Sequence, residues 1–305
     1  FQNYEVDKKL LFPKSYHYRA RMTGSVLAGM KDFVNSTEQR LGSLNGKLVL
    51  DVGCNDGSLL DKFTAKRAKT IGVEPTGAHV DAKGREHAVI NDFFTLSTAK
   101  TIVEVYGPVD VITFTNVFAH IEDLPELLRA VKAVSHEGTR LVVENHYLGA
   151  VLAKNQFDTF YHEHPRTYSF NSFAHIAKTL GKQISALEFP SRYGGNIRVT
   201  IGGEPASDLK TISLMNQTLE REFKFVKDFE DMRNFMTQWK TQKLEQIRQI
   251  VQKDGPLAAK AFPGRAAILI QCLGLDENLI SAVYEKPNSM KVGNFVPGTR
   301  IPIKS

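Results

Sequence analysis

The chain has 305 residues, of which 42% are hydrophobic and 24% charged, and it carries a formal net charge of +6. These values are ordinary for a globular protein, and the length allows two domains with separate cores. No dense basic run with interleaved aromatic residues is found, so we expect no nucleic-acid partner, although a positive charge suits a phosphate-bearing substrate. The two cysteines, Cys54 and Cys272, cannot build a disulfide framework or a four-cysteine zinc site. We find no membrane-spanning run and no signal peptide pattern, and therefore expect no membrane partner and a cytoplasmic location.

The first half of the chain alternates between predicted strands and predicted helices. Apolar runs typical of buried parallel strands occupy residues 47–52, 69–74, 88–91, 109–114 and 139–144. Apolar residues at helical spacing predict helices at residues 59–66, 121–134 and 170–180. Two further segments, 182–189 and 196–201, are expected to form a final hairpin. These elements predict an α/β fold with a seven-stranded, Rossmann-like sheet.

The character of the sequence changes after residue 203. Residues 209–252 form a long, charged, amphipathic stretch that predicts helix. A short α/β region follows, with expected strands at 267–272 and 280–284 and a tail rich in proline and glycine. We therefore expect a first domain of residues 1–203 that includes an N-terminal lid segment, and a smaller C-terminal helical plus α/β domain of residues 204–305 that binds substrate.

A glycine turn follows the first predicted strand. Gly53 and Gly57 flank Asn55, and Asp51 stands two residues before the first glycine. A dinucleotide-binding turn would need different glycine spacing, and an acid at Asp51 would repel a pyrophosphate but suit an ammonium group. A glycine turn with a purely structural role is the alternative.

This pattern resembles motif I of class I S-adenosylmethionine-dependent methyltransferases, with Asn55 in place of the middle glycine. The resemblance implies that S-adenosyl-L-methionine is the cofactor. It also implies that Glu74, at the tip of the second strand, binds the ribose hydroxyls, and that Asp92 and Phe93 lie beside the adenine. The predicted cofactor-binding residues are Asp51, Gly53, Asn55, Gly57, Glu74, Asp92, Phe93 and Asn116.

Acid and base groups are concentrated among aromatic residues at 157–164 (FDTFYHEH). Such surroundings shift pKa values and are typical of reaction centres. Three interpretations fit the segment: a general base with helpers, half of a metal site, or a polar turn. We expect no metal, because no further ligand cluster accompanies His162 and His164.

Four sequence segments carry a narrower resemblance: 116–121 (NVFAHI), 144–170 (ENHYLGAVLAKNQFDTFYHEHPRTYSF), 193–199 (YGGNIRV) and 292–303 (VGNFVPGTRIPI). Together they look like the sugar C-methyltransferases that act on nucleotide-linked ketodeoxysugars. The resemblance implies that Tyr161, Glu163 and His164 belong to the active site and that His120 faces the substrate. This chain departs from the family pattern at His162, where relatives often have an acidic residue. Many relatives also carry an N-terminal zinc-binding domain with several cysteines, and none precedes residue 47 here, so either the chain is truncated or this branch dispenses with that domain.

The chemistry of carbon methylation assigns roles to these residues. A carbon becomes nucleophilic when a proton next to a carbonyl is removed, which requires a base and a donor for the enolate oxygen. We expect His164 to be the base, Glu163 to orient it, and Tyr161 or His120 to donate to the enolate. The predicted substrate-binding residues, several of which core packing would explain as well, are His162, Tyr16, Tyr18, Asn145, Tyr147, Tyr168, Asn196, Arg198, Gly264 and Arg265.

Other functions remain open at this point. An O- or N-methyltransferase acting on a sugar or phosphate conjugate would use the same cofactor turn. A non-catalytic nucleotide-sugar-binding protein is the alternative from another class, and the glycine spacing disfavours a nicotinamide dehydrogenase. We expect a monomer or a homodimer, and the sequence leaves the sugar and its nucleotide undetermined.

Overall fold

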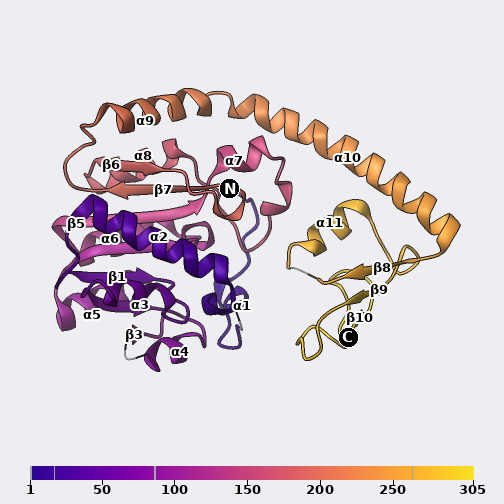
Figure 1. Cartoon of the computed structure of the whole chain (residues 1–305), viewed down its shortest axis with the longest axis horizontal. Helices are drawn as coiled ribbons and strands as arrows, with labels where there is room; N and C mark the ends of the chain where they lie inside the picture. The colour runs from indigo at the N-terminus through magenta and orange to yellow at the C-terminus, as the bar shows by residue number, and fades with distance from the viewer. Residues whose placement is uncertain (1, 17, 86, 263) are drawn as a thin grey trace. The chain divides into compact units, whose positions relative to one another are not determined.

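The structure is a computed structural model that describes residues 2–16, 18–85, 87–262 and 264–305. It divides into two compact units (Figure 1). Phe1–Val151 and His162–Lys224 form the first unit, and Leu152–Tyr161 and Phe225–Ser305 form the second. The compact units separate after residue 224. The predicted functional division after residue 203 stays a prediction.

The first unit is built around a seven-stranded sheet of order β3-β2-β1-β4-β5-β7-β6. Its strands are β1 (Leu48–Val52), β2 (Lys69–Val73), β3 (Ala88–Ile90), β4 (Val109–Thr115), β5 (Ser135–His146), β6 (Ile184–Glu188) and β7 (Asn196–Ile201). The first five strands are parallel, and β7 runs antiparallel to both β5 and β6. The predicted seven-stranded α/β sheet with a terminal hairpin is confirmed. Parallel strands end at one edge of the sheet, and this edge positions the candidate site.

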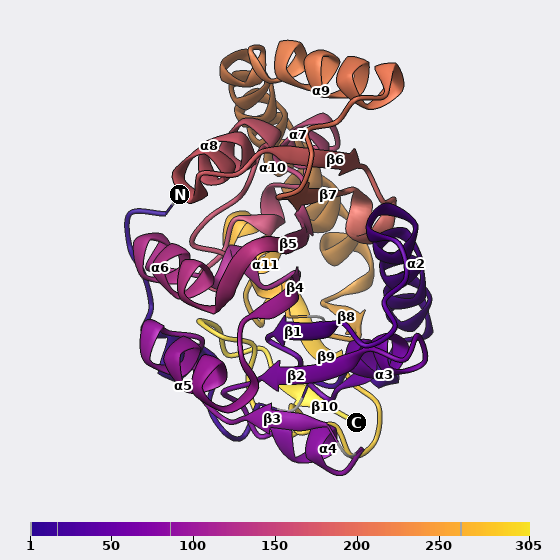
Figure 2. The ribbon, with the colours of Figure 1, turned by 90° about the vertical axis from the view of Figure 1, so that its left-hand side faces the viewer.

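Helices cover both faces of this sheet (Figure 2). Helices α2 and α3 lie on one face, and α5, α6 and α8 lie on the other. The helices of the unit are α1 (Lys8–Leu11), α2 (Gly24–Leu41), α3 (Ser58–Thr64), α4 (His79–Lys83), α5 (Leu96–Tyr106), α6 (Leu124–Val134), α8 (Phe170–Leu180) and α9 (Leu209–Glu222). Helix α7 (Leu148–Ala153) lies at the boundary of the two units. No helix in the described part of the chain is long and apolar enough to cross a membrane.

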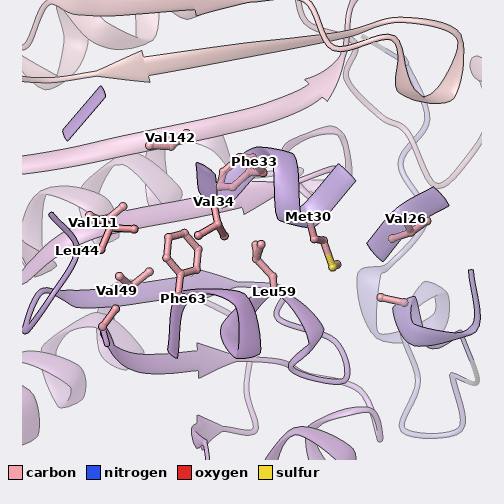
Figure 3. Packing of buried hydrophobic residues seen from close by; sticks show 12 residues of the cluster. Val26, Met30, Phe33, Val34, Leu44, Val49, Leu59, Phe63, Val111 and Val142 are labelled. Carbon is pink, nitrogen blue, oxygen red and sulfur yellow. The ribbon is translucent and has the colours of Figure 1, made fainter. Parts of the chain in front are cut away.

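The core under α2 shows why this helix packs on the sheet (Figure 3). Met30, Phe33 and Val34 recur at helical spacing, and all three are buried. They meet Val49 of β1 and Phe63 of α3 within one cluster of buried apolar side chains. This packing holds α2 beside the strands that end at the candidate site.

Helix α6 begins later than the sequence suggested. Asp123 caps it by accepting a hydrogen bond from the N–H of Glu126 at 2.9 Å, and Pro125 stands in the first turn, where its missing N–H is tolerated. His120, the residue before the predicted helix 121–134, is not part of α6. It lies in a separate 3₁₀ turn, Phe118–His120.

The second unit contains α10 (Phe225–Asp254), α11 (Ala266–Leu273) and a parallel three-stranded sheet of order β10-β9-β8. Its strands are β8 (Leu257–Lys260), β9 (Ile280–Tyr284) and β10 (Ile303–Lys304). The strand predicted at 267–272 is wrong, because this segment is α11. A short apolar run does not distinguish a strand from a helix, and here Gly274 ends a helix in the left-handed conformation (φ 63°). The predicted helical stretch 209–252 is confirmed as two helices, α9 and α10.

Candidate functional site

A cavity of about 250 Å³ lies in the first unit at the carboxyl ends of the parallel strands. Open α/β sheets bind ligands at this edge. The cavity is lined by most of the residues predicted to bind the cofactor: Asp51, Gly53, Asn55, Glu74, Phe93 and Asn116. The turn after β1, the ends of β2 and β4 and the loop after β3 therefore meet around one cavity.

Backbone geometry explains the residue pattern of the turn after β1. Gly53, Asn55 and Gly57 have φ values of 73°, 50° and 79°, in the left-handed region that favours glycine and tolerates asparagine. A Cβ at Gly53 would lie 2.5 Å from a methyl carbon of Val117, so only glycine fits there. Gly57 is not among the residues that line the cavity, and a Cβ there would meet His87 and Ala82 at 3.0–3.1 Å. Its observed role is close packing of the turn.

Two buried carboxylates face this turn. Glu74 accepts hydrogen bonds from the N–H of Asn55 at 2.9 Å and of Thr76 at 2.8 Å. Asp51, 3% exposed, accepts one from the hydroxyl of Thr113 at 2.7 Å. Burial raises the pKa of Asp51 to about 7, and the negative charge of Glu74 adds to the rise while the Thr113 hydrogen bond opposes it. A buried carboxylate with a raised pKa suits a cationic ligand, so Asp51 fits the ammonium group of the expected cofactor.

The loop after β3 separates two residues that were predicted to act together. Phe93 lines the cavity, and the ammonium of Lys8 lies 5.0 Å from the centre of its ring. Asp92 is exposed and is not among the lining residues, and its carboxylate accepts a hydrogen bond from the N–H of Phe93 at 2.7 Å. The structure thus brings Phe93 to the cavity and gives Asp92 a local role in the turn.

N-terminal residues 16 and 18–21 lie along one side of the cavity, and Asn55 binds two of them. The Asn55 amide donates to the carbonyl of Tyr18 at 3.1 Å and accepts from the N–H of Ala20 at 3.0 Å. Asp56 accepts from the N–H of Arg21 at 2.9 Å. Tyr16 and Tyr18 line the cavity, as expected of a lid. The substitution of the middle glycine by Asn55 thus ties the lid to the cofactor turn.

Three histidines gather beside the cavity. The ring centre of His164 lies 5.0 Å from that of His120 and 5.7 Å from that of His146. His120 lines the cavity, and its Nδ1 donates to the carbonyl of Glu163 at 2.6 Å. Burial lowers the pKa of His120, so its ring is neutral at neutral pH and its Nε2 carries a lone pair. His146 is the last residue of β5, where it pairs with Asn196 of β7.

Several other predicted residues are not among those that line this cavity. Tyr161, Gly264 and Arg265 belong to the second unit, where Arg265 donates to the hydroxyl of Thr159 at 3.0 Å. His162 is exposed. No group of three or more His, Cys, Asp or Glu side chains suited to a metal ion occurs among the described residues. The roles of these four residues stay predictions.

Arg198 has a structural environment. It is 4% exposed, and its guanidinium pairs with three carboxylates: Glu144 at 2.8 Å, Glu188 at 2.8 Å and Asp32 at 2.7 Å. A group committed in this way would have to break a buried network to reach a substrate. Nothing in these contacts supports its predicted contact with the substrate.

The remaining predicted substrate residues are buried. Tyr168 packs its ring against Phe118 and Phe173, with ring centres 5.4 and 5.3 Å away, and its pKa is raised by burial. Tyr147 is buried, and burial together with a hydrogen bond to Glu222 raises its pKa. The described structure offers no hydrogen-bond partner to the Asn145 Nδ2, the Asn196 Oδ1 or the Tyr168 hydroxyl. These three atoms keep the prediction of a polar ligand open.

One residue that lines the cavity was missed by the sequence analysis. Arg192 lies in the 3₁₀ turn Arg192–Gly194 between β6 and β7 and donates to Glu144. No local sequence pattern singles it out, because its partners lie far away in the chain.

The chain is similar to known methyltransferases. Residues 26–186 match the family described as methyltransferase domain, and residues 191–305 match the C-methyltransferase C-terminal domain. The C-methyltransferase NovU of Streptomyces niveus is 27% identical over 295 residues, which cover 95% of this chain and 70% of NovU. A ubiquinone biosynthesis O-methyltransferase of Bordetella parapertussis is 29% identical over 104 residues, 33% of this chain and 43% of that protein.

Two solved structures are similar to part of this chain. The magnesium protoporphyrin IX methyltransferase of Synechocystis PCC 6803 with bound SAH has 17% identity and a TM-score of 0.44, covering 58% of this chain and 84% of that one. A protein of Pyrococcus horikoshii OT3 has 15% identity and a TM-score of 0.47, covering 65% and 99%. Since the methyltransferase domain spans more than half of the chain and a C-methyltransferase domain follows it, the chain belongs to the S-adenosylmethionine-dependent methyltransferases, in the branch of the C-methyltransferases.

Proposed function

We propose that this enzyme methylates a carbon atom next to the carbonyl group of a nucleotide-linked keto sugar. The single observation that carries the proposal is the position of His164, whose ring centre lies 5.0 Å from that of His120, which lines the cavity, and 5.7 Å from that of His146. The resemblance of segment 144–170 to sugar C-methyltransferases and the net charge of +6 support the substrate class.

The residues around the cavity fit the cofactor. Asp51 would hold its ammonium group, Glu74 its ribose and Phe93 its adenine, while Gly53 leaves room for close approach. The cofactor supplies an electrophilic methyl group on a positively charged sulfur. The chain has to hold that group in line with the substrate carbon and generate a carbanion there.

His164 is the proposed base. It takes the proton from the carbon, and the electron pair of the broken C–H bond forms the enolate. The carbon would then accept the methyl group of a cofactor held by Asp51, Glu74 and Phe93, with the electron pair of the methyl–sulfur bond remaining on the cofactor. Burial raises the pKa of Tyr16 and lowers that of His120. The negative charge of Glu163 adds to the first shift and opposes the second, so it acts on this neighbourhood. The same charge would stabilise the imidazolium that forms on His164.

Tyr16 is a better donor for the enolate oxygen than His120. A neutral His120 whose Nδ1 donates to Glu163 has a lone pair on Nε2 and no proton to give there. Burial raises the pKa of Tyr16 to about 12, with a further contribution from Glu163, so its hydroxyl keeps its proton and can donate. The donor role predicted for His120 would require a cationic ring, which its burial disfavours.

The proposal is tested with a panel of nucleotide-linked keto sugars and a labelled methyl donor, read by mass spectrometry and NMR. We expect label on a carbon next to the carbonyl of at least one of these sugars. His164→Gln should lower kcat by about 10²- to 10⁴-fold, as expected for the loss of a general base. His175→Gln, an exposed histidine on α8, is the matched control and should keep wild-type turnover.

The outcomes separate the alternatives. Label on oxygen or nitrogen would establish the O- or N-methyltransferase instead. Absence of transfer to every sugar, with tight sugar binding, would favour the non-catalytic binding protein.

A further inference from the structure

Arg192 is a charged residue that lines the cavity and has no role in the proposed reaction. Its Nε and Nη2 donate to one oxygen of Glu144 at 3.0 and 2.5 Å, and its Nη1 donates to the carbonyl of Val26 at 3.3 Å. Asn196 donates to the same Glu144 oxygen at 2.9 Å. Glu144 is fully buried, so the guanidinium is held against a fixed partner at the cavity.

Helix α2 leaves room for this guanidinium at Gly29. Gly29 stands in the interior of the helix, where glycine is less favourable than alanine. A Cβ at this position would lie 1.9 Å from Nη1 of Arg192. The missing side chain therefore has a packing reason, which is to admit Arg192 to its place.

The cavity has few cations for its many acids. Asp51, Glu74, Glu122, Asp123 and Glu126 line it, whereas Lys8 and Arg192 are the only lysine and arginine among the described lining residues. Lys8 pairs with Glu122 at 3.2 Å and lies over the ring of Phe93. It therefore occupies the end of the cavity proposed for adenine.

The strand order places Arg192 at the opposite end. Phe93 follows β3, and Arg192 is anchored on Glu144 of β5, with β2, β1 and β4 between these strands. Four strand spacings amount to about 19 Å. Asp51 and Gly53, at the end of β1, lie between the two cations along this edge.

We propose that Arg192 binds the α-carboxylate of S-adenosylmethionine. The amino-acid end of this cofactor carries an ammonium and a carboxylate. If its adenine lies at Phe93 and its ammonium at Asp51, the carboxylate extends toward β5, where Arg192 is the cation. The inference rests on the cofactor placement of the proposed function and adds the residue that distinguishes an amino-acid tail from a plain amine.

The test compares two ligands by calorimetry. S-adenosylhomocysteine and its decarboxylated analogue, S-adenosyl-3-thiopropylamine, differ by the carboxylate alone. Wild type should prefer S-adenosylhomocysteine by about 10- to 100-fold, the range for a partly buried charge-assisted contact. Arg192→Gln should remove this preference and leave the affinity for the amine analogue within about threefold.

Two further variants keep the test independent of folding and of net charge. Gly29→Ala displaces the guanidinium without removing it and should reduce the preference as well. Lys8→Gln removes the other cation and should leave the ratio of the two affinities unchanged, because Lys8 lies at the adenine end. Thermal unfolding of each variant confirms that it is folded.

An Arg192→Gln variant that still prefers S-adenosylhomocysteine, or that weakens both ligands equally, would overturn the inference. Equal binding of both ligands by wild type would do the same while leaving the cofactor site intact. Failure of wild type to bind either ligand would instead overturn the proposed cofactor site and, with it, the role of Arg192.

Discussion

Asp51→Asn should stabilise the ligand-free enzyme at alkaline pH although it removes the residue proposed to bind the ammonium group of the cofactor. Burial raises the pKa of Asp51 from 3.8 to about 7. Because the folded-state pKa is raised, the protonated carboxyl stabilises the fold fully below pH 3.8, and this contribution is lost as the pH rises through 7. Three pKa units correspond to about 4 kcal/mol of unfolding free energy. The amide of the variant buries an NH₂ group in a site built for a carboxyl, which lowers the free energy of unfolding by about 1–3 kcal/mol at every pH.

The assay is urea unfolding of wild type and Asp51→Asn without ligand, from pH 5.5 to pH 8.5. The difference in unfolding free energy should move by about 2 kcal/mol in favour of the variant between pH 5.5 and pH 7 and then level off. Saturating S-adenosylhomocysteine should reverse the order at pH 8, because it stabilises wild type and binds the variant weakly. If the difference in unfolding free energy between wild type and variant is the same at every pH, ionisation of the buried Asp51 does not destabilise the ligand-free enzyme, and the reasoning is refuted.

Three further outcomes follow from the site. The affinity of wild type for S-adenosylhomocysteine should fall about tenfold per pH unit below pH 7 and level off above it, because binding requires ionised Asp51; calorimetry with a flat profile would contradict this. Asn55→Gly restores the usual glycine pattern but loses the two hydrogen bonds of Asn55 to Tyr18 and Ala20. Proteolysis within residues 16–21 should therefore accelerate, and S-adenosylhomocysteine should bind about 5- to 30-fold more weakly. An unchanged rate of proteolysis would show that these hydrogen bonds do not hold the lid. Tyr16→Phe should lower kcat by about 10²- to 10³-fold with an unchanged affinity for the cofactor, and a change in affinity alone would make Tyr16 a binding residue.

Local patterns made most of the sheet and the cofactor turn predictable. The strands of the first unit are largely apolar runs. Asp51 lies near the end of β1, and Gly53 and Glu74 directly follow β1 and β2, so topology alone brings the three residues to one cavity. The segment 267–272 was predicted incorrectly because eight or fewer apolar residues suit either a strand or a buried helix. Its helical state depends on packing and on the cap at Gly274.

The residues that the sequence did not reveal depend on contacts between distant segments. Arg192 reaches the cavity only because Glu144 holds it and Gly29 makes room for it. The donor state of His120 is set by the main-chain carbonyl of Glu163, which no side-chain pattern encodes. Conversely, Arg198 was predicted to bind substrate and lies in the resembling segment 193–199, and the register of β7 with β5 places it opposite Glu144 in a buried network.

The central claim is that His164 removes a proton from a substrate carbon before the methyl group moves. The direct measurement is incubation of the accepted keto sugar in deuterated water with the enzyme and S-adenosylhomocysteine, which permits deprotonation but no transfer, followed by NMR of the C–H signal next to the carbonyl. Wild type should exchange that proton for deuterium, and His164→Gln should exchange it at least about 10²-fold more slowly while binding S-adenosylhomocysteine as tightly as wild type. Exchange at the same rate in both proteins, or methyl transfer to carbon at an undiminished rate by His164→Gln, would contradict the account.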